Sequence, residues 1–253
     1  NRYNKYVKTT KETNIYKLEN NNYIEDGLIN KDVIIELPEL VISYETEYFK
    51  IKDIDYYINY KDVIKTDNNI NDRYKKYVLF NKNIITTKET TFYDENNRIV
   101  IKINKSYDLP IIIYNEDYFG VEFLNRLLYI KKDEVKTIKD SNNTKEKTRT
   151  NIRTLTYHTV YQKGKETCDN IYVCHPIEQF EEHMKYISEK GYFTLTMEEL
   201  EMFLNNQIRI PKNSIVITLD DGRKLHNSIP IIEKYKIDAT MFIITGVNSV
   251  ADY

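Results

Sequence analysis

Two kinds of hydrophobic pattern divide the chain. From residue 1 to about 140, short β-branched and aromatic runs, such as residues 33–35, 99–101 and 111–114, alternate with clusters of Asn, Asp and Lys. Short runs separated by frequent turn residues are typical of an all-β unit. From about residue 151, strand-like runs alternate instead with segments whose apolar residues recur at helical spacing. This alternation of β and α elements predicts a parallel sheet or barrel.

The first region contains an internal repeat. Residues 2–7 recur as 73–78, 9–13 as 86–90, 47–49 as 117–119, and 62–66 as 133–137. The offsets are 71, 77, 70 and 71, which indicates a repeat of about 71 residues with one insertion. Two copies at this period indicate duplicated small domains rather than a solenoid. We predict five or six short strands in each copy, at residues 1–71 and 72–138.

The second region begins after a polar segment. Residues 139–150 contain no apolar residue and predict a solvated linker between domains. In the helix predicted next, Ile177, Phe180, Met184 and Ile187 share one face. Thr196 has the position of an N-cap for the following helix. The predicted elements are a strand at 152–157, a helix at 177–190, a strand at 193–196, a helix at 197–205, a strand at 215–219, a helix ending at 236 and a strand at 239–244.

Two carboxylates, Asp220 and Asp221, directly follow the apolar run 215–219, and Gly222 comes after them. In α/β folds, the carboxyl end of a strand is where functional groups are placed. Neighbouring side chains at a strand end point to opposite faces. One aspartate can therefore bind a metal while the other accepts a proton from a metal-bound water. The alternative is a turn that only ends a strand, because Asp and Gly favour turns.

The flanking residues point to a family. Residues 218–222 (TLDDG) resemble the Thr-Phe-Asp-Asp-Gly motif of the polysaccharide deacetylases (NodB-type, carbohydrate esterase family 4). This resemblance extends over about residues 152–247 and implies an irregular (β/α) barrel, with residues 151–253 as its N-terminal portion. The segment from 222 to 230 is about two residues shorter than the family pattern. The other matching segments are 155–158 (LTYH), 180–187 (FEEHMKYI), 191–200 (GYFTLTMEEL), 230–235 (PIIEKY) and 239–244 (ATMFII).

The resemblance implies a reaction and roles for both aspartates. Asp220 would be the general base, and Asp221 would bind a divalent metal, expected to be zinc. The family completes the metal site with two histidines four residues apart, and no histidine follows His226 in this sequence. The chain alone is therefore expected to be inactive. The implied reaction is hydrolysis of N-acetyl groups on a cell-surface or cell-wall hexosamine polysaccharide, by an extracellular or cell-wall-associated bacterial protein.

A second interpretation is a non-catalytic cell-wall or glycan-binding protein with an inactive or truncated barrel. The repeats resemble bacterial SH3-like domains in their strand pattern, and such modules often bind cell-wall material. A scaffold role is the alternative. The 23 tyrosines would form a sugar-binding surface or reflect an AT-rich genome. A glycoside hydrolase using Asp220 fits less well, because adjacent carboxylates do not flank a glycosidic bond.

The four histidines differ in their setting. His158 lies just past a predicted strand and His226 near the start of a helix. Both are therefore candidates to contact the aspartates without themselves binding the metal. A structural role is the alternative for each. His183 falls on the polar side of its helix and is predicted to be solvated. His175 precedes a proline in a loop and is predicted to be structural.

Charge, hydropathy and cysteine spacing bear on the partners and location expected for the protein. The net charge of −2 gives no electrostatic reason to expect nucleic acid as a partner. No run approaches 18 apolar residues, so no membrane span is predicted, and no signal peptide or anchor is visible. Cys168 and Cys174 lie six residues apart. They would form a disulfide in an exported protein, remain free thiols, or, together with His175, bind a metal.

Overall fold

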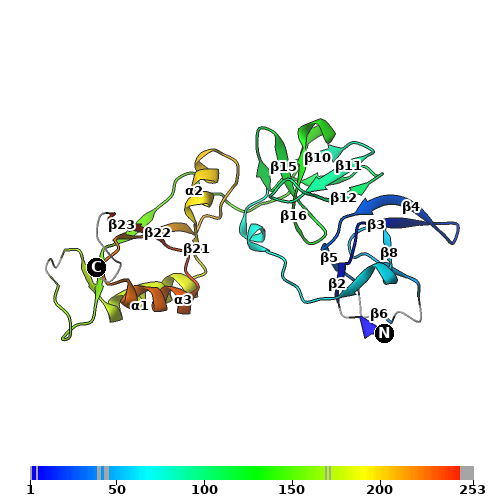
Figure 1. The fold of residues 1–253 in the computed structure, drawn as a ribbon. Coiled ribbons are helices and arrows are strands. Elements are labelled where there is room, and N and C mark those ends of the chain that lie inside the picture. The colour runs from blue at the N-terminus through cyan, green and yellow to red at the C-terminus, as the bar shows by residue number, and fades with distance from the viewer. Residues whose placement is uncertain are drawn as a thin grey trace. The chain divides into compact units, whose positions relative to one another are not determined.

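A computed structural model describes residues 2–3, 5–38, 41–42, 46–168, 170 and 172–245. The chain forms two compact units, residues 1–145 and 146–253, and each is described by itself (Figure 1). The first unit contains strands and short 3-10 turns, as the alternating pattern predicts. The second combines parallel strands with three helices in its described part.

The N-terminal unit contains the same strand arrangement twice. In each copy, a three-stranded antiparallel sheet (β5-β2-β9 or β13-β10-β17) accompanies strands that belong to one shared nine-stranded sheet. The elements of the first copy are β1 (Arg2–Tyr3), β2 (Tyr6–Thr9), β3 (Thr13–Glu19), β4 (Asn22–Ile29), β5 (Ile34–Glu36), β6 (Val41–Ile42), β7 (Tyr48–Lys50), β8 (Tyr57–Asn59), η1 (Tyr60–Asp62) and β9 (Val63–Lys65). Those of the second copy are η2 (Arg73–Lys76), β10 (Lys82–Thr86), β11 (Thr90–Tyr93), β12 (Ile99–Ile103), β13 (Asp108–Pro110), β14 (Ile113–Tyr114), β15 (Tyr118–Phe123), β16 (Arg126–Lys131), η3 (Lys132–Glu134) and β17 (Val135–Asp140).

Hydrogen bonds show which residues of the two copies correspond. Thr9 Oγ1 accepts from the backbone N–H of Val33 at 2.9 Å, and Thr86 Oγ1 accepts from that of Tyr107 at 2.8 Å. The offset of 77 residues predicted for residues 9–13 therefore also relates equivalent positions in the structure. The offset of 71 predicted for residues 2–7 is wrong, because residues 73–76 form η2 and the counterpart of β2 is β10.

The two copies are joined at the middle of the nine-stranded sheet, where β4 pairs with β12. Ile29 lies opposite Ile101, and Gly27 lies opposite Ile103. A single hydrophobic core includes side chains from both copies, among them Ile15, Phe49 and Ile58 of the first and Phe92, Phe119 and Ile130 of the second. A small domain gains stability by covering its core with a neighbour, and here each copy covers the other. The SH3-like identity of the copies stays a prediction.

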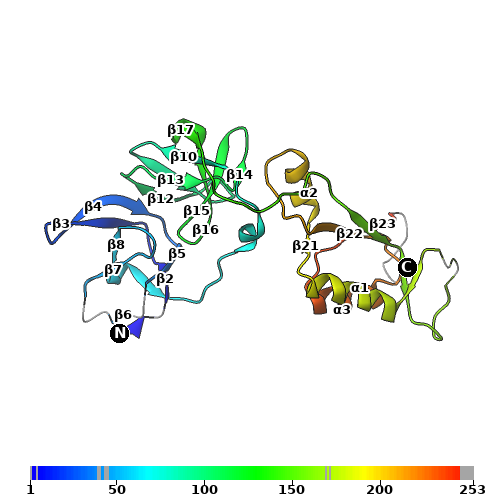
Figure 2. The same ribbon diagram turned by 180° about the vertical axis from the view of Figure 1, so that it is seen from behind.

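The C-terminal unit is built around one buried strand, β22 (Ser214–Asp221). It runs parallel to β18 (Thr154–Tyr157) and to β21 (Phe193–Thr194) and β23 (Thr240–Ile243). Helices α1 (Ile177–Glu189) and α3 (Leu225–Tyr235) lie side by side in both views (Figures 1 and 2). The remaining elements are β19 (Thr159–Tyr161), β20 (Cys174–Pro176) and α2 (Met197–Leu204).

Most local predictions for this unit hold. Phe180, Met184 and Ile187 are the buried residues of α1, as their spacing predicts. Thr196 caps α2 in a reciprocal capping box with Glu199. The parallel pairing of β18, β22 and β23 agrees with the predicted sheet, whereas closure into a barrel stays a prediction. No helix in the described ranges is both long and apolar enough to cross a membrane.

The predicted linker is too long at both ends. Residues 139 and 140 belong to β17, whose side chains are mostly exposed, so its polar composition resembles a linker. At the other end, Thr148 forms a β-bridge with Pro211, and the backbone N–H of Arg149 bonds to the carbonyl of Ile210. The boundary between the two units falls at residues 145 and 146, inside the predicted segment.

Candidate functional site at the carboxyl end of β22

The register of the parallel strands brings three predicted site residues to one edge. Tyr157 of β18 pairs with Leu219 of β22. The next residues along the two chains, His158 and Asp220, therefore lie side by side at this edge, because parallel strands advance together. Asp221 follows Asp220 at the end of the strand. All three side chains are half-buried.

Asp220 has an unusual environment for a carboxylate. Its Oδ1 atom is buried and has no hydrogen-bond partner among the described residues. Leaving a buried acceptor unpaired costs about 1–3 kcal/mol, so native proteins keep few such atoms. An oxygen in this state is suited to accept a proton from a water or to contact a cation.

The turn after the strand is conformationally demanding. The φ angles of Asp221, Gly222 and Lys224 are 67°, 72° and 52°, all in the left-handed region. Gly222 suits this region, and a Cβ there would lie only 2.9 Å from Ile243 Cγ2. For Lys224, the left-handed region costs roughly 1–2 kcal/mol, whereas Asp adopts it more readily. Contacts from outside the turn must offset this cost.

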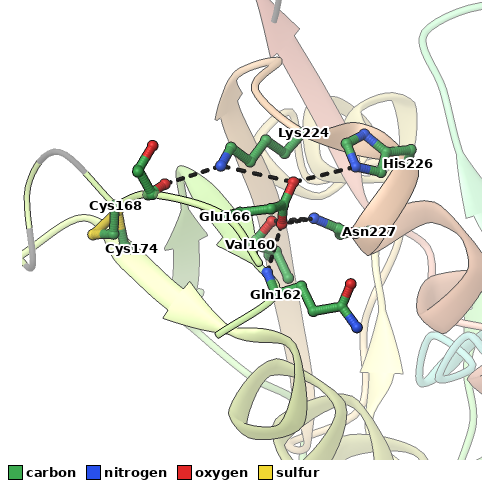
Figure 3. A network of polar contacts seen from close by, with 9 residues as sticks. Val160, Gln162, Glu166, Cys168, Cys174, Lys224, His226 and Asn227 are labelled. Atoms are coloured by element: carbon green, nitrogen blue, oxygen red, sulfur yellow. Dashed lines mark hydrogen bonds and ion pairs between the residues drawn. A yellow bond between two sulfur atoms is a disulfide. The ribbon is translucent and has the colours of Figure 1, made fainter. Parts of the chain in front are cut away.

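Glu166 supplies one set of such contacts (Figure 3). Its Oε2 atom accepts from the backbone N–H of Gln162 at 2.6 Å and from Asn227 Nδ2 at 2.8 Å. Its Oε1 atom lies 3.7 Å from Lys224 Nζ and 3.5 Å from His226 Nε2. The backbone hydrogen bond from Gln162, followed by the contact with Asn227, lowers the pKa of the Glu166 carboxyl below its ordinary 4.5.

Further hydrogen bonds join the segment around Glu166 to the start of α3. Lys224 Nζ donates to the carbonyl of Thr167 at 2.9 Å, and Asn227 Nδ2 also donates to the carbonyl of Val160 at 3.0 Å. Just beyond, a disulfide joins Cys168 and Cys174 (Figure 3). Of the three states that the sequence left open for these cysteines, the structure shows the disulfide.

The histidines fall into two groups. His226, the second residue of α3, is 68% exposed and contacts Glu166. The prediction that the His183 side chain is solvated is wrong. This side chain is half-buried, and its Nδ1 atom lies 3.0 Å from Tyr157 Oη. His175 packs edge-to-face on Tyr157 at 5.0 Å. Burial, with the nearby His183, lowers the pKa of His175, in keeping with the structural role predicted for it.

The described residues supply only part of a metal site. No three His, Cys, Asp or Glu side chains within the described ranges come close enough together to hold an ion. Zinc sites use three or four protein ligands. The unpaired Asp220 oxygen and the adjacent Asp221 carboxylate are donors of a suitable kind for a divalent cation, but two carboxylates do not complete a site.

A groove of about 1000 Å³ also lies in this unit. Its walls include Leu155 and Tyr157 of β18, His183 and Tyr186 of α1, and Ser214 at the start of β22. Ser214 stands at the opposite end of β22 from the aspartates, whereas Tyr157 pairs with Leu219, the residue before Asp220. Neither aspartate is among the residues that line the groove.

Comparison with known proteins found relatives that match part of the chain. No family model matches the chain. Over 71 residues it is 35% identical to YxkH of Bacillus subtilis, which is named as a polysaccharide deacetylase; the match covers 27% of this chain and 25% of that protein. Over 70 residues it is 39% identical to the poly-beta-1,6-N-acetyl-D-glucosamine N-deacetylase of Staphylococcus aureus, covering 27% of this chain and 24% of that protein. The chain thus spans about a quarter of the length of these curated relatives.

The resemblance to polysaccharide deacetylases predicted from TLDDG and its flanking segments is confirmed by these relatives. Among solved structures, the chain is similar to the deacetylase PplD of Streptococcus pyogenes in complex with acetate. The TM-score is 0.33 at 28% identity, covering 38% of this chain and 43% of that one.

Sequence reasoning missed the residues that hold the turn. Glu166, Lys224 and Asn227 stand in no recognisable motif, and their contacts join positions about 60 residues apart. The nearest signal in the sequence was the cysteine pair. A disulfide at Cys168 restrains the backbone directly after residues 166 and 167.

Proposed function

We propose that the chain forms part of a metal-dependent deacetylase that removes N-acetyl groups from a cell-surface or cell-wall hexosamine polysaccharide. The observation that carries the proposal is the buried, unpartnered Oδ1 of Asp220 at the carboxyl end of the central strand. The similarity to proteins named as polysaccharide deacetylases supports it.

In this proposal the two aspartates have different tasks. Asp220 accepts a proton from the water that attacks the acetamide carbonyl carbon, and its unpaired oxygen is the acceptor. Asp221 is a ligand of the metal, with further ligands from outside the described residues. When bound, a divalent metal such as zinc would polarise the acetamide carbonyl and lower the pKa of water. The C–N bond then breaks, acetate leaves, and the amine nitrogen takes up a proton.

The test uses the protein purified from its natural source and the 253-residue chain in parallel. Acetate release from poly-N-acetylglucosamine and metal content are measured for each. We expect activity in the natural protein, none in the chain alone, and loss of bound metal in Asp221→Ala. Full metal occupancy in that variant would refute the role of Asp221. Inactivity of the metal-loaded natural protein would refute the deacetylase proposal.

A second candidate function, glycan binding by the N-terminal unit, is favoured by surface tyrosines. In the first copy, Tyr48 stacks on Tyr23 with ring centres 4.0 Å apart, and Tyr16 meets Tyr48 edge-to-face at 5.0 Å. These side chains are half-buried or exposed, on the face of the sheet opposite the core. Tyrosine combines a flat apolar face with a polar tip, which suits it to surfaces that bind partly polar ligands.

The second copy repeats the arrangement. Tyr118 meets Tyr129 edge-to-face at 4.9 Å, and Tyr129 pairs across the sheet with Tyr93. Two similar clusters on one unit would bind a repetitive polymer with higher avidity than either alone. This duplication supports binding of a polysaccharide, whereas a pure scaffold would have no need of it.

Binding is tested by cosedimentation of the 253-residue chain with insoluble chitin and with purified peptidoglycan. Tyr48→Ala and Tyr118→Ala are each expected to weaken binding several-fold, and the double variant more than either. Tyr172→Ala is the control, because Tyr172 is 89% exposed in the other unit. Equal binding by all four variants would exclude the tyrosine clusters.

The location of the protein belongs to the same proposal. Disulfides persist in oxidising compartments and are rare in reducing ones. The Cys168–Cys174 disulfide therefore supports an extracellular or cell-wall-associated protein.

A further inference from the structure

Residues 162–168 form a segment that we call the strap, because it contacts the first turn of α3 and ends at the disulfide (Figure 3). Within the strap, the Glu166 carboxylate and the Thr167 carbonyl face α3 and contact Lys224, His226 and Asn227. The contacted residues lie three to six positions beyond Asp221. The strap is thus attached to the element that begins where the candidate catalytic strand ends.

Lys224 shows why the strap is needed. It stands at the N-cap of α3, where the helix dipole is unfavourable for a positive charge. Its backbone is left-handed, and its side chain is only 23% exposed. Nothing in local helix preference explains a lysine at this position. The strap stabilises its ammonium group instead: Lys224 Nζ donates to the Thr167 carbonyl and forms an ion pair with the Glu166 carboxylate.

We propose that Glu166 is a positioning residue for the aspartate pair. Through Lys224 and Asn227 it fixes the turn at residues 221–224, and the turn sets the direction in which Asp221 and its neighbour Asp220 leave the strand. The Cys168–Cys174 disulfide keeps Glu166 at the turn. The catalytic consequence of this role rests on the proposed deacetylase function, whereas the mechanical consequence does not.

The chain contains a matched control for this role. Glu181 of α1 contacts the opposite end of the same helix, where it pairs with Lys234 and accepts from Tyr235 Oη at 3.0 Å. Both glutamates therefore join α3 to a neighbouring segment by a lysine and a second donor. Only Glu166 acts beside the aspartates.

The experiment compares Glu166→Ala with Glu181→Ala in the 253-residue chain by amide hydrogen exchange. We expect the amides of residues 222–224 to exchange about tenfold faster in Glu166→Ala and at the wild-type rate in Glu181→Ala. The first variant removes the ion pair with Lys224 and the hydrogen bond from Asn227, whereas the second removes contacts at the far end of α3. Reducing the disulfide with dithiothreitol should accelerate the same amides in the wild type and add little in Glu166→Ala. Glu166→Gln keeps the acceptor oxygen and guards against simple unfolding; we expect an intermediate rate.

Equal exchange at residues 222–224 in both alanine variants and the wild type would overturn the proposal, as would equal acceleration in both. In the natural protein, Glu166→Ala should lower kcat about tenfold with little change in KM, while Glu181→Ala retains activity. If the wild type releases no acetate, the deacetylase proposal fails, and the exchange rates still decide the role of Glu166.

Discussion

Two carboxylates, Glu36 in the N-terminal unit and Asp220 in the C-terminal unit, have opposite surroundings. In the N-terminal unit, Glu36 is only 4% exposed, and its Oε1 atom lies 2.7 Å from both Lys5 Nζ and Lys52 Nζ. Its Oε2 atom accepts from Asn125 Nδ2 of the second copy at 2.9 Å. In the C-terminal unit, Asp220 keeps a buried oxygen without a partner in the described residues.

This difference separates a carboxylate that holds the fold together from one that is available for chemistry. A satisfied buried carboxylate contributes to stability, because removing it leaves its donors without their partner. An unsatisfied one costs stability and persists where another requirement keeps it. Replacing Glu36 should therefore lower stability, whereas replacing Asp220 should lower activity and leave stability unchanged or higher.

The largest expected effect is that of Asp220→Asn in the natural protein. Turnover should fall about 10²–10⁴-fold, because a neutral amide cannot accept the proton that Asp220 takes. The free energy of unfolding should stay the same or rise, since the variant removes a carboxylate whose buried Oδ1 atom has no donor among the described residues. Acetate release and thermal unfolding measure the two quantities. A loss of stability with unchanged turnover would remove the contrast with Glu36.

The next effect concerns the junction of the two copies. A Cβ on Gly27 would lie 2.3 Å from the backbone oxygen of Lys102, on the strand that joins the second copy to the first. Gly27→Ala should therefore destabilise the N-terminal unit by about 2–3 kcal/mol, because a backbone atom cannot move aside cheaply. Denaturant unfolding checks this. Gly164→Ala is the control for adding a methyl group, since its Cβ would meet no atom within 4 Å, although its φ of 84° adds some strain.

A smaller effect is expected for Glu36→Ala. Its loss removes two lysine contacts and the bond from Asn125, which should lower the free energy of unfolding by about 1–2 kcal/mol. The value stays modest because Lys5 and Lys52 are 56% and 38% exposed, so water can solvate them afterwards. Denaturant unfolding of this variant and of Lys8→Ala, which loses a more exposed ion pair with Asp32, provides the measurement and its reference. An equal loss in both would mean that burial of Glu36 adds nothing.

Local pattern predicted the elements that bury a regular face. The α1 face at Phe180, Met184 and Ile187, the cap at Thr196 and the buried run before Asp220 follow from residue spacing and capping chemistry alone. The placement of His158 beside Asp220 did not follow from either, because it depends on the register between two strands about 60 residues apart.

Elements that depend on a distant partner were missed. Strands β19 and β20 are three residues each and, within the described ranges, pair only with one another, so neither has a local pattern of its own. The last two residues of the polar edge strand β17, 139 and 140, were assigned to the linker. Glu166 is an ordinary polar loop residue until the fold brings α3 against it. In each case the information lies in a pairing, which periodicity cannot supply.

The smallest effect is the acid dependence of the Glu36 contacts. Burial alone would raise the pKa of Glu36, but hydrogen bonds from Lys5 and Lys52 outweigh it and hold the pKa below the ordinary 4.5. A carboxyl whose pKa is lower in the folded state stabilises the fold fully above its unfolded pKa, and this stabilisation is lost as pH falls through the folded pKa. The difference in unfolding free energy between the wild type and Glu36→Gln should therefore be constant near neutral pH and shrink below about pH 4.5. Urea unfolding of both proteins from pH 7 to pH 3 measures it, and a difference that grows on acidification would show that Glu36 is not held in its charged form.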